Sequence, residues 1–222
     1  MTSQVLLRRR QMTKALRWSA LLFFGFLIVT QQVMTNGPLV NIDSNLSHKK
    51  RPHLSHWLDF ILRKIDNLGL RGLTATVLLI AAVLISYQFR SWRPLNLALL
   101  SLLALNGTVG IAKLAIGRTK PRLNIDLIHA GGLSYPSGHA SNALLTWGIL
   151  AYLIYRYRYR EVLHGRMLAV FVGTITLAVC SVSLFRQTHW FSDLLGGLFI
   201  GGSLLVLIIA IDRFVPSERQ PS

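Results

Sequence analysis

The chain has 222 residues, a mean hydropathy of +0.46, 14% charged residues and a net charge of +16. A soluble domain usually carries about 25% charged residues, so this composition argues against a water-soluble globular protein. The basic balance raises nucleic acid as a partner, but the cations gather at the ends of apolar stretches, as they do in membrane proteins. We therefore expect a single integral membrane domain over residues 1–222, with the lipid bilayer as its partner and no nucleic acid.

Six apolar stretches follow one another along the chain, each close to the 17 to 25 or so residues that a membrane-spanning helix needs. In chain order they are residues 18–34, 73–89, 95–116, 140–155, 167–185 and 194–211. Helices buried in a large soluble core are the alternative, but the chain has too few polar residues to cover six of them. The expected fold class is therefore all-α, a bundle of six transmembrane helices.

The loop between the first two spans, residues 35–72, contains an amphipathic segment. Its apolar residues recur at helical spacing, namely Leu54, Trp57, Leu58, Ile61, Ile65 and Leu68. Charged residues such as Asp59 and Lys64 fall on the other side of that helix. The pattern predicts an amphipathic helix that lies in the membrane interface, or alternatively a short lid packed on the bundle.

Basic residues indicate which way the bundle is inserted. With six spans, the basic groups at 8–17, 90–93, 156–166 and 213–219 all fall on one side of the membrane. The positive-inside rule makes that side cytoplasmic, although these groups hold only 13 of the 24 lysines and arginines. We expect a multi-pass plasma-membrane protein with both termini in the cytoplasm.

The third span ends in a basic segment that contains Lys113, Arg118, Lys120 and Arg122. Cations at the end of a span cost free energy unless they reach the aqueous surface or bind an anion. Pro121 is expected to end the helix and direct the loop that follows. Taken alone, the segment fits a basic flank that reaches toward water.

The fourth span is preceded by Pro136, Ser137, Gly138 and His139. Ser137 is expected to be the N-cap of that helix, and the N–H groups of a helix N-terminus provide a seat for an anion. Gly138 lets a ligand approach the backbone closely. His139 at the mouth of the seat can donate a proton to a leaving oxygen, a role that a simple helix cap would not require.

The sixth span is preceded by His189, with Asp193 four residues later. If a helix begins near His189, the carboxylate can accept a hydrogen bond from one imidazole nitrogen and fix the tautomer. The other nitrogen then becomes a nucleophile or a base. The pair could instead bind a metal together with Asp126, His129 or His139, but the spacing matches no zinc signature, and we expect no metal and no cofactor.

These segments resemble the motifs of the type-2 phosphatidic-acid phosphatase superfamily, six-helix membrane lipid phosphatases whose pattern is K-x6-R-P, P-S-G-H and S-R-x5-H-x3-D. P-S-G-H is complete at residues 136–139, H-x3-D is complete at His189 and Asp193, and the resemblance covers about residues 73–211. It implies that His189 attacks phosphorus to form a phosphohistidine, that Asp193 orients His189, and that His139 protonates the leaving group. It also implies that no metal is needed.

The cationic part of the motif departs from the family pattern. Lys120 stands where the family has arginine, and the S-R pair would fall at Val182 and Ser183. Arg186, three residues later, is expected to reach the same phosphate oxygens if the fifth span is still helical there, and Arg118 or Arg122 could replace the other arginine. The phosphate-binding residues implied in this way are Lys113, Lys120, Ser137, Gly138, Arg186, Arg118 and Arg122.

The resemblance implies a lipid phosphatase that hydrolyses a phosphomonoester or diphosphate of a lipid at the extracytoplasmic face. Polyprenyl diphosphate such as undecaprenyl diphosphate, phosphatidylglycerol phosphate and phosphatidic acid all remain possible substrates. The short loops favour a lipid that enters sideways from the bilayer. A lipid-linked phosphotransferase with the same site, and a non-catalytic protein that binds or transports lipid phosphates, are the alternatives. The sequence does not determine the oligomeric state.

Overall fold

The computed structural model describes residues 3–47, 54–121, 126–159 and 161–215. All regular secondary structure in these residues is helical, which confirms the all-α fold class. The long helices are α1 (Ser3–Met34), α4 (Arg71–Gln88), α5 (Arg93–Ile116), α6 (Gly138–Ile154), α7 (Val162–Phe185) and α8 (Phe191–Phe214). The short ones are α2 (Pro38–Ser47), α3 (His56–Asn67) and a π-helical turn, η2 (Tyr155–Tyr159).

Among the described residues, five helices are long and apolar enough to cross a membrane. They are Leu6–Met34 of α1 together with the whole of α4, α5, α7 and α8. The sequence predicts six spans, and the difference lies in α6, which has 17 residues before the backbone widens into η2. The structure therefore supports a protein that crosses the membrane several times.

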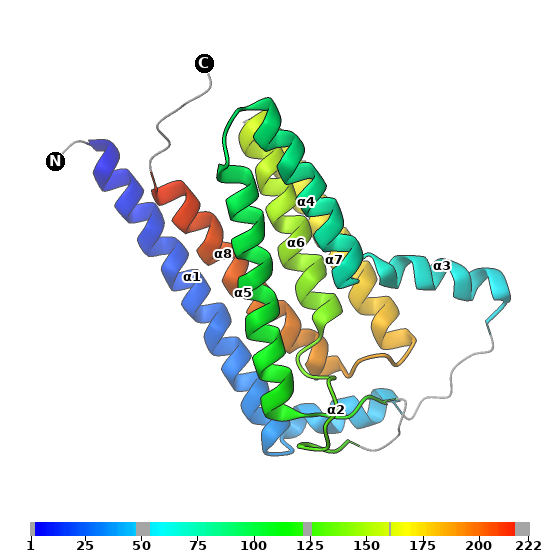
Figure 1. The fold of residues 1–222 in the computed structure, drawn as a ribbon. Coiled ribbons are helices and arrows are strands. Elements are labelled where there is room, and N and C mark those ends of the chain that lie inside the picture. The colour runs from blue at the N-terminus through cyan, green and yellow to red at the C-terminus, as the bar shows by residue number, and fades with distance from the viewer. Residues whose placement is uncertain (1–2, 48–53, 122–125, 160, 216–222) are drawn as a thin grey trace.

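Helix α6 lies at the centre of the bundle and packs against α4, α5, α7 and α8, while α1 runs along α8 (Figure 1). Glycines on α8 allow the close contact with α6, because small residues let the backbones of membrane helices approach. A Cβ atom at Gly197 would lie 2.5 Å from the carbonyl oxygen of Ser137, and one at Gly201 would lie 3.1 Å from the Cα atom of Ser141. The two helices run in the same direction, so their N-termini meet at one end of the bundle.

Two features of the helices differ from the prediction. Helix α1 begins at Ser3 and includes the basic residues that precede the expected span, because leucine, arginine, lysine and alanine all favour helix. Helix α2, with Pro38 as its first residue, is a helix of 10 residues that was not predicted. It packs against α1 and α8 across the end of the bundle (Figure 1).

The predicted amphipathic helix is present as α3. Ser55 caps it, and the Ser55 Oγ atom accepts a hydrogen bond from the backbone N–H of Leu58 (3.4 Å). Helix α3 packs against α7 and projects sideways from the bundle (Figure 1). Its outer face is apolar, since Trp57 is 74% exposed and Phe60 is 46% exposed.

At the end of the bundle away from the N-termini of α6 and α8, Asp212 on α8 joins that helix to α5 and α6. The Nε atom of Arg93 on α5 donates to its Oδ1 atom (2.7 Å), and the hydroxyl of Tyr152 on α6 donates to its Oδ2 atom (2.6 Å). Arg156 in η2 also pairs with the Asp212 carboxylate. This end is therefore held together by ion pairs rather than by apolar packing alone.

Candidate active site

The three motif segments meet where α5 ends and where α6 and α8 begin (Figure 1). Helix α5 ends at Ile116 because Gly117 adopts a left-handed conformation with φ of 59°, so the expectation that Pro121 ends this helix was wrong. Ser137 caps α6 as predicted, and its Oγ atom accepts a hydrogen bond from the N–H of Ala140 (3.3 Å). The backbone after α5 thus turns sharply at the end of the bundle where α6 and α8 begin.

The rings of His139 and His189 lie close together at this end of the bundle, tilted against each other. Their ring centroids are 5.8 Å apart, with the planes inclined at 57°. His189 is 5% exposed and comes two residues before α8, whereas His139 is half-buried in the first turn of α6. The structure thus brings together the two imidazoles that the sequence motifs contain.

Asp193 lies behind His189, in the first turn of α8. Its Oδ2 atom is 3.4 Å from the Nδ1 atom of His189 and also accepts hydrogen bonds from the backbone N–H of Trp190 (3.1 Å) and from the hydroxyl of Ser134. Its Oδ1 atom accepts from Nη1 of Arg118 (2.8 Å). These contacts fix the orientation of a carboxylate that is fully buried. Ser134 has no counterpart in the predicted site.

Lys113 crosses from the last turn of α5 to the N-terminus of α6. Its Nζ atom donates to the carbonyl oxygen of Leu133, and its Cε atom lies 3.9 Å from the position that a Cβ atom would take at Gly138. A side chain at position 138 would therefore be in van der Waals contact with the lysine. The arrangement offers an ammonium group and backbone N–H groups to a single anion.

Arg118 is completely buried, unlike the phosphate-facing arginine that the sequence allows for. All five of its N–H donors have acceptors within the protein. The acceptors are Asp126 Oδ1 (2.8 Å), Asp126 Oδ2 (2.6 Å), Asp43 Oδ2 (2.7 Å), Ser192 Oγ (2.6 Å) and Asp193 Oδ1 (2.8 Å). Burial alone would lower the pKa of Arg118, but the carboxylates of Asp126, Asp193 and Asp43 raise it above its ordinary value. No donor is left for a phosphate oxygen.

Arg186 forms the C-cap of α7, and its backbone is still helical. Its side chain pairs with α3, because Nη1 donates to Oδ2 of Asp66 (3.1 Å) and Nε lies 3.8 Å from Oδ1 of Asp59. The hydroxyl of Ser183 donates to the other oxygen of Asp66 (2.7 Å). The turn after α3 also touches His139, since a Cβ atom at Gly69 would lie 2.8 Å from its carbonyl oxygen. Arg186 therefore reaches the edge of the site, held by α3.

The other predicted residues lie as follows. Lys120 is exposed in the loop after α5, and Arg122 lies outside the described residues. Asp43, Asp66, Ser134 and Ser192 are the buried polar residues of the site that the sequence motifs do not identify. Within the part of the chain that the structure describes, no three histidine, cysteine, aspartate or glutamate side chains are grouped to hold a metal ion.

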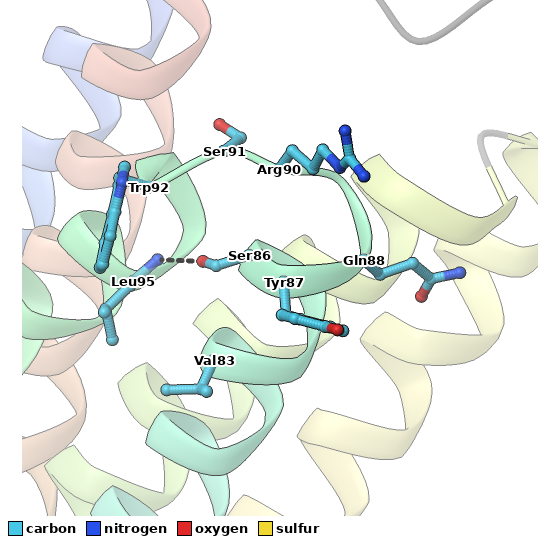
Figure 2. Close-up of a pocket in the computed structure, with 8 residues that line it drawn as sticks. All are labelled: Val83, Ser86, Tyr87, Gln88, Arg90, Ser91, Trp92 and Leu95. Carbon is cyan, nitrogen blue, oxygen red and sulfur yellow. Dashed lines mark hydrogen bonds between the residues drawn. The ribbon is translucent and has the colours of Figure 1, made fainter.

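A cavity of about 650 Å³ lies elsewhere, at the turn between α4 and α5 (Figure 2). The residues that line it are Val83, Ser86, Tyr87, Gln88, Arg90, Ser91, Trp92 and Leu95. None of them belongs to the three motif segments, and the turn is close to the Asp212 end of the bundle. The cavity is therefore separate from the histidine pair.

Comparison with known proteins decides the family. Residues 94–215 match the family model described as the PAP2 superfamily. The chain belongs to the PAP2 superfamily. This result confirms the resemblance to type-2 phosphatidic-acid phosphatases, and the matched region contains His139, His189 and Asp193. The chain is accordingly an enzyme of a family of phosphoric ester hydrolases.

Two further comparisons show what this PAP2 chain is similar to. It is 25% identical to phosphatidylglycerophosphatase B of Bacillus subtilis (strain 168) over 202 residues. The aligned region covers 90% of this chain and 97% of the relative. A crystal structure described as the first transmembrane PAP2-type phosphatidylglycerolphosphate phosphatase from Bacillus subtilis matches with a TM-score of 0.75 and 24% identity. That match covers 90% of this chain and 98% of the solved chain, so the two share a fold.

Proposed function

We propose that this PAP2 protein is a lipid phosphatase of the plasma membrane that hydrolyses a lipid phosphomonoester or diphosphate at the extracytoplasmic face. The observation that carries the proposal is the close pair of His139 and His189, with ring centroids 5.8 Å apart and Asp193 against one ring. Similarity to a phosphatidylglycerophosphatase makes phosphatidylglycerol phosphate the first substrate to test. Phosphatidic acid and undecaprenyl diphosphate are the next.

In the first step of the proposed mechanism, Nε2 of His189 attacks the phosphorus atom. A phosphorus–nitrogen bond forms while the phosphorus–oxygen bond to the leaving group breaks. His139, as an imidazolium, donates its proton to the departing oxygen, so a phosphomonoester releases the neutral lipid alcohol and a diphosphate releases the protonated lipid monophosphate. Asp193 accepts the Nδ1–H of His189 and stabilises the positive charge that develops on that ring.

In the second step a water molecule attacks the phosphohistidine. His139, now neutral, accepts the proton of this water, the phosphorus–nitrogen bond breaks, and phosphate is released with both histidines in their starting states. The phosphate-binding groups in this proposal are Lys113, Lys120, Arg122, Ser137, the backbone N–H of Gly138, and Arg186. Arg118 is not among them, because its donors already bind carboxylates and a serine.

The proposed membrane arrangement follows from the same structure. Helix α6 is the fourth of six spans and completes that number, since 17 residues are enough to cross a thin or locally deformed bilayer and it lies inside the bundle. Helix α3 lies in the outer interface, with Trp57 and Phe60 toward the lipid. The space beside α3 would then let a lipid phosphate reach the histidines from the side.

The test is phosphate release by purified protein from a panel of phosphatidylglycerol phosphate, phosphatidic acid and undecaprenyl diphosphate. We expect activity on at least one lipid, a loss of about 10³-fold or more in His189→Ala, and full activity after EDTA treatment. His164→Ala is the matched control, because His164 lies on α7 near its start, where it pairs with Glu161 (3.2 Å).

Equal background release by wild type and His189→Ala on every lipid would exclude the phosphatase. The binding or transport alternative would then be favoured if the lipids still bound. A phosphotransferase would instead form a labelled phosphoenzyme that is emptied only when an acceptor lipid or sugar is added. Loss of activity with EDTA would contradict the metal-free mechanism.

A further inference from the structure

Three acidic residues from different parts of the chain converge on Arg118 behind the histidine pair. Asp43 comes from α2, Asp126 from the segment before α6, Asp193 from α8, and Arg118 itself from the loop after α5. Arg118 and Asp43 are both buried, and the ring of Trp190 packs against the guanidinium, whose carbon lies 5.1 Å from the ring centroid. A single cation is thus surrounded by three carboxylates, of which only Asp193 also contacts a catalytic histidine.

The two oxygens of Asp193 have different partners. Oδ1 binds the guanidinium of Arg118 (2.8 Å), whereas Oδ2 faces the Nδ1 atom of His189 (3.4 Å). If the carboxylate rotated so that Oδ2 moved away from His189, Oδ1 would also lose its hydrogen bond with Arg118. The fork of Arg118 cannot rotate either, because Asp126 holds Nε and Nη2 (2.8 and 2.6 Å) and Asp43 holds Nη2 from another side (2.7 Å).

Asp43 also ties this assembly to the start of α8. Its Oδ1 atom accepts the backbone N–H of Ser192 (2.9 Å), and its Oδ2 atom accepts the Ser192 hydroxyl (2.5 Å). A carboxylate at a helix N-terminus is stabilised by the free N–H groups there. The segment that carries Asp193 is therefore fixed both through its side chain and through its backbone.

We propose that Arg118 is a positioning residue for the reaction, which holds Asp193 so that Oδ2 stays against His189 and the nucleophile keeps one orientation. This inference rests on the proposed function, in which His189 attacks phosphorus. Arg118 acts through Asp193 and does not touch the substrate. A lysine at this position would keep the charge but would not replace the planar fork that binds three acids at once.

The test compares Arg118→Gln and Arg118→Lys with wild type in the full-length purified protein. For Arg118→Gln we expect kcat to fall about 10- to 100-fold while KM stays nearly unchanged, and for Arg118→Lys an intermediate kcat. Arg93→Gln is the matched control, because Arg93 binds Asp212 at the other end of the bundle, and the folded protein should keep its kcat. Wild-type kcat in Arg118→Gln, or a raised KM with normal kcat, would overturn the inference.

A double-mutant cycle separates positioning from a general loss of structure. If Arg118 acts through Asp193, the variant with both Arg118→Gln and Asp193→Asn should be no slower than Asp193→Asn alone. Losses that multiply would overturn the inference. Should Arg118→Gln fail to fold, Asp126→Asn loosens the same fork from a side chain that is 19% exposed, and its kcat should still fall at constant KM. Inactive wild type would refute the proposed function instead.

Discussion

The two histidines of the site are surrounded differently, and this suggests a division of labour. His189 is almost fully buried and has Asp193 against its Nδ1 atom, as a nucleophile that must keep one tautomer requires. His139 is half-buried, in the first turn of α6, with the turn after α3 against its backbone. A group that delivers a proton to a leaving lipid oxygen needs this greater access.

This division predicts how His139→Ala responds to the leaving group. A general acid typically contributes about 10²- to 10⁴-fold, so hydrolysis of a lipid alkyl phosphate should fall by that factor. A nitrophenyl phosphate ester, whose phenolate leaves without a proton, should lose much less. The measurement is the ratio of kcat values for the two substrates in wild type and His139→Ala. Equal losses on both substrates would contradict the role of His139 as the acid.

The Arg186 side chain already has acidic partners within the protein, with which a substrate phosphate would compete. The pairing with Asp66 (3.1 Å) and the nearby Asp59 (3.8 Å) holds the guanidinium at the edge of the site. A phosphate that binds Arg186 has to share it with these acids or displace them. Because both acids belong to α3, substrate binding at Arg186 would also change how firmly α3 is held.

At the scale of helices, the contact between α6 and α8 sets the distance between the two catalytic motifs. Gly197→Ala places a methyl group 2.5 Å from the carbonyl oxygen of Ser137, whereas nothing lies within 4 Å of a Cβ atom at Gly173 on α7. Overpacking costs about 1–3 kcal/mol, while alanine in place of a helical glycine gains up to about 1 kcal/mol. Gly197→Ala should therefore lower both the thermal midpoint and kcat, whereas Gly173→Ala should preserve kcat.

Calorimetry or a thermal shift in detergent, together with phosphate release, measures both effects. A Gly197→Ala protein as stable and as active as Gly173→Ala would mean that α6 and α8 are not in the close contact described. It would also remove the structural reason for placing Ser137 beside the start of α8.

Most helices could be predicted from sequence because long apolar runs bounded by charges leave few alternatives. The same was true of Ser137 as a helix cap and of the pairing of His189 with Asp193, both of which depend on local spacing. Helix α2 was missed because 10 residues carry too short a periodic pattern. Helix α6 was predicted as a span, yet its 17 residues are fewer than the 18 of α4 and the 24 of α5, α7 and α8.

Contacts between distant segments could not be predicted in the same way. Asp43 and Arg118 are 75 residues apart and have no motif in common. One signal was available, because three of the chain's 8 acidic residues, Asp43, Asp59 and Asp66, lie in the loop between the first two predicted spans. It would have drawn attention to Asp43 and Asp66, but not to which cation each of them binds.

For the whole molecule, the orientation in the membrane is the main prediction. Leu127, near the histidines, and Val162, at the opposite end of α7 from Arg186, are both well exposed, at 50% and 68%. The chain has one cysteine, so Leu127→Cys and Val162→Cys can each be made in a Cys180→Ser background. In intact cells, a membrane-impermeant maleimide should label Leu127→Cys only, and permeabilised cells should label both. The reverse pattern would place the site in the cytoplasm.

Helix α8 is fastened near each end by an arginine from another segment, Arg118 at Asp193 and Arg93 at Asp212. The two aspartates lie 19 positions apart in one continuous helix, and each residue advances the helix by about 100°. One residue inserted between them would turn Asp193 by that angle relative to Asp212, so both ion pairs could not survive without a bulge. The length of α8 is thus fixed by contacts near both of its ends, and this helix should tolerate a substitution on its exposed face better than an insertion.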